Sequence, residues 1–234
     1  YSLDYFSGIN DYGAKIDFNY YPASKHELNM GVSGTYHVYK PGVTVLESVI
    51  ENGNTFESKI GNKNIFGTEI SAYACDNMTI TGRIKANIGL HYSAFIVRKK
   101  FYQSFEPRLS ARLLVTENFS IKAAFTKMNQ YIHLLTNSTI GLPTDLWLPS
   151  TDSIGPQKSY QAALGFAYNL QDKWDFRIEG FYKDMKGLIE YKEGSSFFAE
   201  NDNWESKLEI GRGWSYGGEV LARKTTGKRT GWIG

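Results

Sequence analysis

The feature that most constrains this sequence is an alternation of apolar and polar side chains that runs through unusually long stretches. In the clearest one, residues 78–93, apolar or small side chains take every even position and polar side chains or glycine every odd position. Residues 12–20 and 28–38 repeat the pattern. A period of two is that of a β-strand with one apolar face, and such stretches exceed the usual globular strand of about five or six residues. They predict strands able to cross a bilayer, which needs about nine to eleven residues.

The connections between the predicted strands are sorted by length. Weaker alternation at Phe66–Ala74, Phe105–Val115, Phe119–Phe125, Tyr160–Leu170, Trp174–Tyr182 and Tyr216–Ala222 brings the total to roughly ten strands. Short turns at 21–26, 75–77, 116–118, 171–172 and 225–228 alternate with longer connections at 39–64, 96–104, 126–159 and 183–211. This order places the short turns at one rim and the long loops at the other. We therefore predict an all-β fold, an antiparallel up-and-down transmembrane β-barrel.

The aromatic residues of the apolar face support a membrane location. One group lies beside the predicted short turns and another towards the long loops: Tyr20, Phe119, Tyr168 and Trp174, then Tyr36, Tyr92, Phe105, Phe125, Tyr160 and Tyr182. The middles of the strands carry aliphatic or small residues such as Ile16, Val32 and Leu164. Amphipathic rings prefer the two headgroup levels of a membrane, so the arrangement predicts two aromatic girdles.

Composition excludes several other classes of protein. No apolar run reaches the roughly 18 to 20 residues of a membrane helix. The net charge is only +2 and the basic residues form no run, so we expect no nucleic-acid partner. Cys75 is the single cysteine, which excludes an intramolecular disulfide and a thiolate zinc cluster.

The face opposite the apolar one is strongly charged. In a barrel it would line the lumen, with Lys15, Asp17, Glu69, Arg83, Lys85, Arg108, Arg112, Arg177, Glu179 and Glu219 as lining residues. In a soluble β-sandwich the same face would be the solvated outside, so its polarity alone does not separate the two folds. Strand length and the sorting of the loops favour the barrel.

Several short motifs in order resemble the barrels of TonB-dependent outer-membrane receptors of the Bacteroidota type. They are DYGAK at 11–15, EPRLSAR at 106–112, QYIHLL at 130–135, LPTDLW at 142–147 and GWSYGGE at 213–219. The resemblance implies a barrel of about 22 strands, filled by an N-terminal plug that engages TonB. The chain shows neither plug nor TonB-engaging segment, so we expect residues 1–234 to be part of one barrel domain. Its partners would be outer-membrane lipid, TonB through the plug, and an unidentified nutrient.

The sequence offers little enzymatic chemistry. His26, His37, His91 and His133 form no metal-ligand spacing with Asp, Glu or Cys, so we expect no metal site and no cofactor. Glu179 and Glu219 could be imagined as a glycosidase pair, but their simpler interpretation is lumen charge. No Gly-Xaa-Ser-Xaa-Gly motif is present. We predict that the chain is not an enzyme.

The long connections are the place where we expect recognition, because loops carry function on rigid scaffolds. The candidate ligand-binding residues of this rim are Gln130, Tyr131, His133, Trp147, Tyr191 and Trp204. For the segment 142–147 we favour a structural role, packing the loop onto its neighbours. Three functions stay open: energised uptake by a TonB-dependent receptor, passive conduction by a porin, and binding by a soluble β-sandwich.

Two hairpins give testable registers. Across the turn at Pro22, Tyr12 should face Tyr36 and Ile16 should face Val32, since parity places these residues on one face. Across a tight turn at 75–77, facing residue numbers should sum to roughly 152 to 154, which brings Glu69 opposite Arg83 or Lys85. About ten strands cannot close at the curvature of 22, so we also expect a curved, open sheet with free edges near Tyr1 and Gly234.

Overall fold

The computed structural model describes residues 2–49, 55–61, 64–135, 146–193 and 204–234. Nearly all of them are in β-strands, and a single turn of 3-10 helix, η1 (Trp204–Lys207), is the one helical element in these ranges. The strands are β1 (Ser2–Ala23), β2 (His26–Val49), β3 (Thr55–Gly61), β4 (Ile65–Thr79), β5 (Ile84–Val97), β6 (Lys100–Thr116), β7 (Phe119–Gln130), β8 (Ile132–Leu135), β9 (Leu146–Pro149), β10 (Gln157–Leu170), β11 (Trp174–Tyr191), β12 (Leu208–Lys224) and β13 (Gly231–Ile233). No helix among these residues is long and apolar enough to span a membrane.

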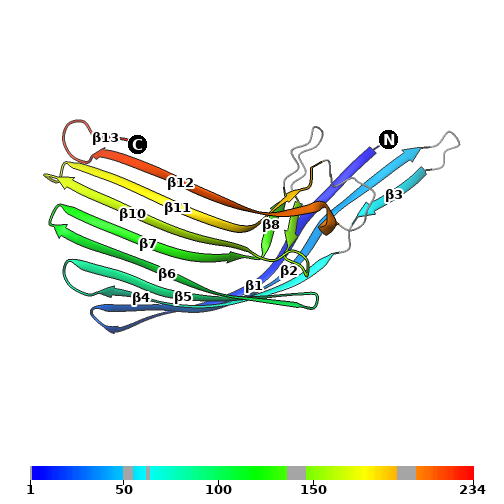
Figure 1. Ribbon diagram of the computed structural model, residues 1–234, viewed down its shortest axis with the longest axis horizontal. Helices are drawn as coiled ribbons and strands as arrows, with labels where there is room; N and C mark the ends of the chain where they lie inside the picture. Colours follow the sequence, from blue (N-terminus) through cyan, green and yellow to red (C-terminus); the bar gives the residue numbers. More distant parts are fainter. Residues whose placement is uncertain (1, 50–54, 62–63, 136–145, 194–203) are drawn as a thin grey trace.

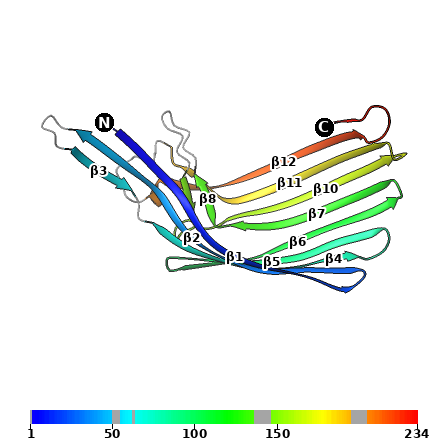
Figure 2. The same cartoon turned by 180° about the vertical axis from the view of Figure 1, so that it is seen from behind.

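Eleven strands form one antiparallel sheet, and ten of them follow one another across it in chain order (Figures 1 and 2). Their order is β1-β2-β4-β5-β6-β7-β10-β11-β12-β13, and β3 pairs with the outer part of β2. The short strands β8 and β9 form a separate hairpin. The all-β, up-and-down fold and the count of about ten strands are thus confirmed. Most strands are longer than the alternation indicated, but the stretch 78–93, predicted as one strand, is divided between β4 and β5 by a turn.

The first hairpin has the predicted register. Tyr12 faces Tyr36 and Ile16 faces Val32 across β1 and β2. The turn lies at Ser24 and Lys25, between Ala23 and His26. Period-two parity together with the predicted position of the turn therefore gave the correct pairing.

The second predicted hairpin is wrong. Residues 75–77 lie inside β4, which continues to Thr79, and the turn falls at 80–83. The facing partner of Glu69 is Phe95, and the register places neither Arg83 nor Lys85 opposite it. The turn is held by the Thr81 hydroxyl, which accepts hydrogen bonds from the backbone N–H groups of Arg83 and Ile84. Arg83 is therefore a turn residue, and its carbonyl accepts a bond from the N–H of Leu114.

The sorting of the connections holds with one exception. Short turns at 24–25, 80–83, 117–118, 171–173 and 225–230 share one end of the sheet, on the left in Figure 1. At the other end, the predicted long connection 96–104 is instead a tight turn at Arg98 and Lys99, because β5 and β6 extend to meet there. Arg98 adopts a positive φ of 51°, a turn conformation that its side chain gave no reason to expect.

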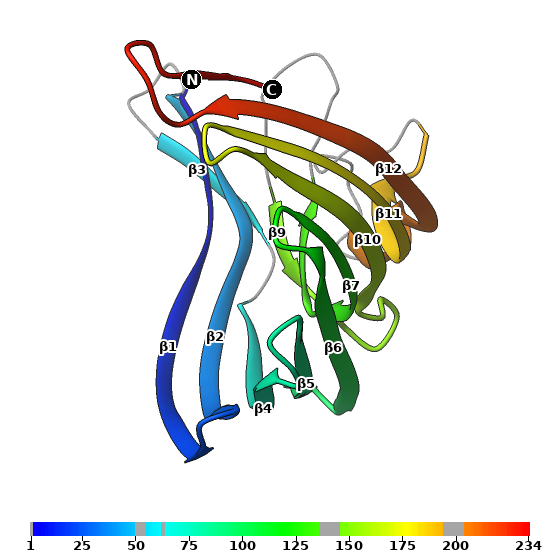
Figure 3. The ribbon, with the colours of Figure 1, turned by 90° about the vertical axis from the view of Figure 1, so that its left-hand side faces the viewer.

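The sheet is curved and open. In Figure 3 it bends around the segment labelled β9, which defines a concave face. Within the described residues β1 pairs only with β2, and β12 has a second neighbour only at Ala222–Lys224, where β13 joins it. The expectation of a partial barrel with free edges is confirmed.

The two faces of the sheet differ in their surroundings. On the convex face large apolar side chains are exposed, including Tyr12, Ile16, Ile178, Trp214 and Tyr216. On the concave face the buried residues of the strands pack against β8 and β9. No second sheet covers the apolar face anywhere in the described part of the chain, which is the arrangement a β-sandwich would require.

Candidate functional site

The candidate site is the concave face together with the β8–β9 hairpin that lies on it. The hairpin contacts both halves of the curved sheet, since β9 contacts β1 and β2 while β8 contacts β11. Its apolar side chains join those of the strands in one buried cluster: Tyr39, Ile65, Phe95, Val97, Tyr131, Leu135, Leu146, Leu148, Ile154 and Leu208. This cluster lies at the loop end of the sheet and holds the hairpin in place.

Aromatic stacking and a buried hydrogen-bond network anchor the start of the hairpin. The ring of Tyr131 stacks on Phe95, with centroids 5.0 Å apart and planes at 13°. Its hydroxyl lies 2.8 Å from Ser93 Oγ, which donates to Glu106 Oε1 at 2.7 Å. Glu106 also lies 3.2 Å from His91 Nδ1. Burial of a carboxylate is costly unless it is hydrogen-bonded, so the network accounts for the placement of Glu106.

His133 is fully buried within the hairpin. Its Nε2 lies 3.1 Å from Ser150 Oγ and its Nδ1 lies 3.1 Å from Gln157 Nε2. Both ring nitrogens therefore have a polar side chain of the protein within hydrogen-bond distance. Burial lowers the pKa of His133 to about 4, against a smaller opposing effect of a hydrogen bond with the Gly155 backbone. The imidazole is therefore neutral at physiological pH.

A second polar cluster ties the first strands together. His37 is almost fully buried, with Nδ1 2.7 Å from Asp11 Oδ1 and Nε2 3.8 Å from Glu69 Oε2. Its ring lies against Tyr39 and Phe95, at centroid distances of 5.5 Å and 6.2 Å. Asp11, His37 and Glu69 come from β1, β2 and β4, so the cluster joins three neighbouring strands.

Towards the short turns the concave face becomes a band of charge. Lys15 lies 3.0 Å from Asp17, which accepts a hydrogen bond of 2.7 Å from the Tyr73 hydroxyl. Asp175 lies between Arg177 and Arg223, at 3.3 Å and 2.7 Å. The remaining charges of the band lie in one cross-strand row: Lys85, Arg112 and Lys122 on β5, β6 and β7, then Glu179 and Glu219 on β11 and β12.

Parity therefore places nine of the ten predicted lining residues on the concave face. Lys15, Asp17, Glu69, Lys85, Arg108, Arg112, Arg177, Glu179 and Glu219 share that face, and Arg83 lies in a turn. Their role as lumen lining stays a prediction.

The predicted rim residues separate into buried and accessible side chains. Tyr131 and His133 are buried with their polar atoms bonded inside the chain, so contact with a ligand would require the hairpin to move. Gln130 is exposed and donates to the carbonyl of Ile132, and Trp147 is 39% exposed. Tyr191 is half-buried at the end of β11. Trp204 lies in η1, and its side chain is outside the described residues. Ligand contact by these residues stays a prediction.

Sequence reasoning missed the residues that fasten the hairpin. Glu106, Ser93 and His37 are buried polar groups with concave parity, and only the return of β8 and β9 onto this face explains their burial. In the sequence, these three residues are distinguished only as polar residues close to aromatic ones. That pattern is too common in strands to identify buried residues. Among the described residues, no group of three or more His, Cys, Asp or Glu side chains is placed to hold a metal ion.

Long antiparallel strands in one curved sheet, with exposed apolar side chains outside and bonded polar groups inside, define the wall of a transmembrane β-barrel. The family model described as "TonB dependent receptor-like, beta-barrel" matches residues 1–232. The chain therefore belongs to the TonB-dependent receptor-like β-barrel family.

Three solved structures with a similar fold are much longer than this chain. The FrpB iron transporter of Neisseria meningitidis is 16% identical with a TM-score of 0.64, covering 94% of this chain and 33% of its own. The ferric-catecholate import receptor Fiu of E. coli K12 is 14% identical with a TM-score of 0.57, covering 97% and 36%. The ferric yersiniabactin receptor FyuA of Yersinia pestis is 13% identical with a TM-score of 0.65, covering 97% and 34%. The chain thus spans about a third of these proteins. A search of curated proteins found no match.

Proposed function

We propose that this chain forms part of the wall and the outer loops of a bacterial outer-membrane receptor that takes up a nutrient with energy delivered through TonB. The observation that carries the proposal is the contrast between the two faces of one sheet. Ile178 on the convex face is 57% exposed, while its neighbour Glu179 lies on the concave face among other charges. Exposed aliphatic side chains along a whole sheet face are stable in lipid and costly in water.

The chain's role in the receptor would be structural and selective, without chemical catalysis. The wall would hold the plug and guide the solute, and the β8–β9 hairpin would narrow the opening at the loop end. The plug of the receptor and its outer-membrane location belong to the proposal and are supported by family membership. The Bacteroidota type also belongs to the proposal, and its support is the resemblance of the short sequence motifs. FrpB, Fiu and FyuA are named for iron or ferric compounds, so iron complexes are the first substrates to test.

Spin labels on adjacent residues test the membrane location. In the full-length product of the gene, Cys75 and any further cysteine are replaced by serine, and single cysteines then replace Ile178 or Glu179. We expect the label at 178 to be accessible to oxygen dissolved in lipid and the label at 179 to a water-soluble nickel chelate. Val220 and Glu219 on β12 form a second pair with the same expected contrast. Equal water access at 178 and 179 would contradict the proposal.

The passive porin is the alternative that shares this wall. In planar bilayers, the full-length product of a plugged receptor should give no steady unitary conductance in potassium chloride, whereas a porin should conduct at all times. Uptake of a radiolabelled ferric chelate by whole cells should stop when TonB is deleted. Steady conductance with uptake independent of TonB would favour the porin.

A further inference from the structure

Three positive side chains lie side by side on the concave face near the short turns. Lys85 faces Arg112 across β5 and β6, and Arg112 faces Lys122 across β6 and β7. Neighbouring strands are about 4.8 Å apart, so the three charges start from backbone positions within about 10 Å of each other. Like charges on facing positions destabilise a sheet, so this arrangement, called here the cation row, is costly without an anion.

The cation row lacks the carboxylates that balance other cations on this face. Lys15 pairs with Asp17, and Arg177 pairs with Asp175. Across the described ranges, by contrast, no carboxylate oxygen comes within 4.0 Å of the charged groups of Lys85, Arg112 or Lys122. The Nε atom of Arg112 is also shielded from solvent and has no hydrogen-bond partner. A shielded donor of this kind is normally paired with a protein acceptor, an ordered water or a bound ion.

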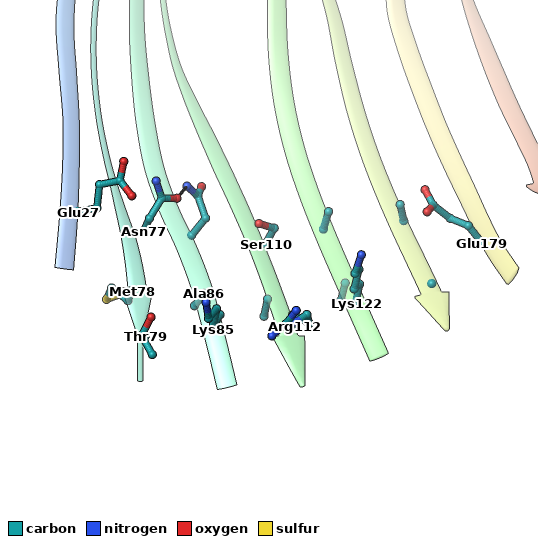
Figure 4. A pocket seen from close by; sticks show the side chains of 16 residues that line it. Glu27, Asn77, Met78, Thr79, Lys85, Ala86, Ser110, Arg112, Lys122 and Glu179 are labelled. Carbon is teal, nitrogen blue, oxygen red and sulfur yellow. Dashed lines mark hydrogen bonds between the residues drawn. The ribbon is translucent and has the colours of Figure 1, made fainter. Parts of the chain in front are cut away.

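Small residues beside the cation row leave space for such an acceptor. Ala124, Ala163 and Gly165 line a hollow of about 510 Å³ together with the three cations. Figure 4 shows the cationic side chains on three neighbouring strands, with Glu27 on one side of the hollow and Glu179 on the other. The two glutamates repel an anion that extends beyond the cations, so they limit its size.

We infer that the cation row binds a small solute carrying two or more carboxylate or phosphate groups. Arg112 offers a planar fork that matches the paired oxygens of either group, and the two lysines act as point charges on both sides. The limits set by Glu27 and Glu179 favour a small polyanion over a long acidic segment of polypeptide. The inference rests on the proposed function, because it takes the concave face to be the path of the solute.

Calorimetric titration of the full-length product in detergent micelles tests the inference, with pyrophosphate and citrate as probes. Arg112→Gln should weaken binding about tenfold, since it removes a charge-assisted hydrogen bond. Arg112→Lys keeps the charge without the planar fork, so its affinity for the probes should lie between those of Arg112→Gln and the unchanged protein. The triple variant with glutamine at 85, 112 and 122 should show no measurable binding. Binding by the unchanged protein should weaken between about 50 mM and about 300 mM sodium chloride.

Lys183→Gln is the matched control, because Lys183 lies on the same face of β11, nearer the loops, and has no ion pair among the described residues. It should leave binding unchanged. Heat-dependent mobility in gels confirms that each variant is folded. Equal binding by Arg112→Gln and the unchanged protein would overturn the inference. Variants that lose thermal stability but bind the probes as well as the unchanged protein would overturn it too. That second result would indicate that the cation row pairs with an acidic protein segment. Either result, with the spin-label contrast intact, would leave the proposed function standing.

Discussion

Single glycines allow aromatic rings to lie flat on the concave face. Gly31 faces Tyr73 across β2 and β4, and a Cβ at Gly31 would lie 2.7 Å from Tyr73 Cε1 and 2.5 Å from Asp17 Oδ1. Gly217 has the same relation to Phe181, at 2.8 Å. The rings occupy the volume that side chains would take, so here glycine is required by packing.

Gly31→Ala should therefore destabilise the protein by about 1 to 3 kcal/mol, because the new methyl group displaces Tyr73 and breaks its bond to Asp17. Urea unfolding in lipid vesicles measures the loss. Gly34→Ala on the same strand is the control, since its nearest neighbour would be the Glu69 carbonyl oxygen at 3.9 Å. An equal effect of both substitutions would show that strand propensity, and not the ring, decides.

His133 should make docking of the hairpin sensitive to acid. Its pKa is about 4 when buried and about 6.5 when the hairpin is open, so the open form binds a proton first as the pH falls. The free energy that favours the docked hairpin is therefore at its full value above about pH 7. It declines between pH 6.5 and 4, by on the order of 3 kcal/mol. Hydrogen exchange at residues 132–135, measured across this range, should show faster opening at low pH. His133→Gln should flatten the profile, and an unchanged slope would refute the assignment.

At the scale of elements, Phe95 connects the hairpin to the wall. It is fully buried, stacks on Tyr131 and lies beside His37. Phe95→Ala should cost about 3 to 5 kcal/mol, most of it in docking of β8 and β9, since β4 and β5 pair through their backbones. Protease cleavage at residues 131–135 or 146–149 reports that docking. Ile96→Ala changes the next residue, on the convex face, and should leave cleavage unchanged.

The long strands of the sheet could be located from the sequence, but the turn between β4 and β5 could not. Alternation runs without a break through Met78, Ile80, Gly82 and Ile84, so the parity pattern gives no sign of the turn at 80–83. The composition of 75–77 looked like a turn because its polar residues usually make local bonds. Here Asn77 instead accepts a bond from Asn87 across the strands, and Asp76 lies 2.7 Å from His26. Cross-strand partners thus replaced local ones.

The charged band of the site was predictable, and its buried part was not. Parity alone assigns Lys85, Arg112 and Glu179 to one face, since a strand alternates its side chains regardless of tertiary contacts. The burial of Tyr131 and His133 depends on a loop returning into the curve of the sheet. Such packing between segments distant in sequence leaves no periodic pattern. The sequence therefore predicted that these two residues are exposed at the rim and contact a ligand.

At the scale of the whole molecule, the sheet has most of its charged side chains inside and exposed apolar side chains outside, apart from the apolar cluster that packs against the β8–β9 hairpin. A soluble domain has the reverse arrangement. The described part of the sheet also ends in two unpaired edges, at β1 and along most of β12. Unpaired backbone groups cost several kcal/mol each in lipid, so further strands must pair with both edges when the wall is in a membrane.

The position of the buried cluster has a consequence for the heat capacity of unfolding. Apolar side chains raise the heat capacity only when unfolding transfers them to water. Convex residues such as Ile178 and Val220 would stay beside hydrocarbon, whereas Leu146, Leu148 and Tyr131 would enter water as soon as the hairpin opens. Hairpin opening would thus carry the calorimetric signature of a small soluble domain. The temperature dependence of the unfolding free energy would be strongly curved for the β8–β9 hairpin and only weakly curved for the sheet.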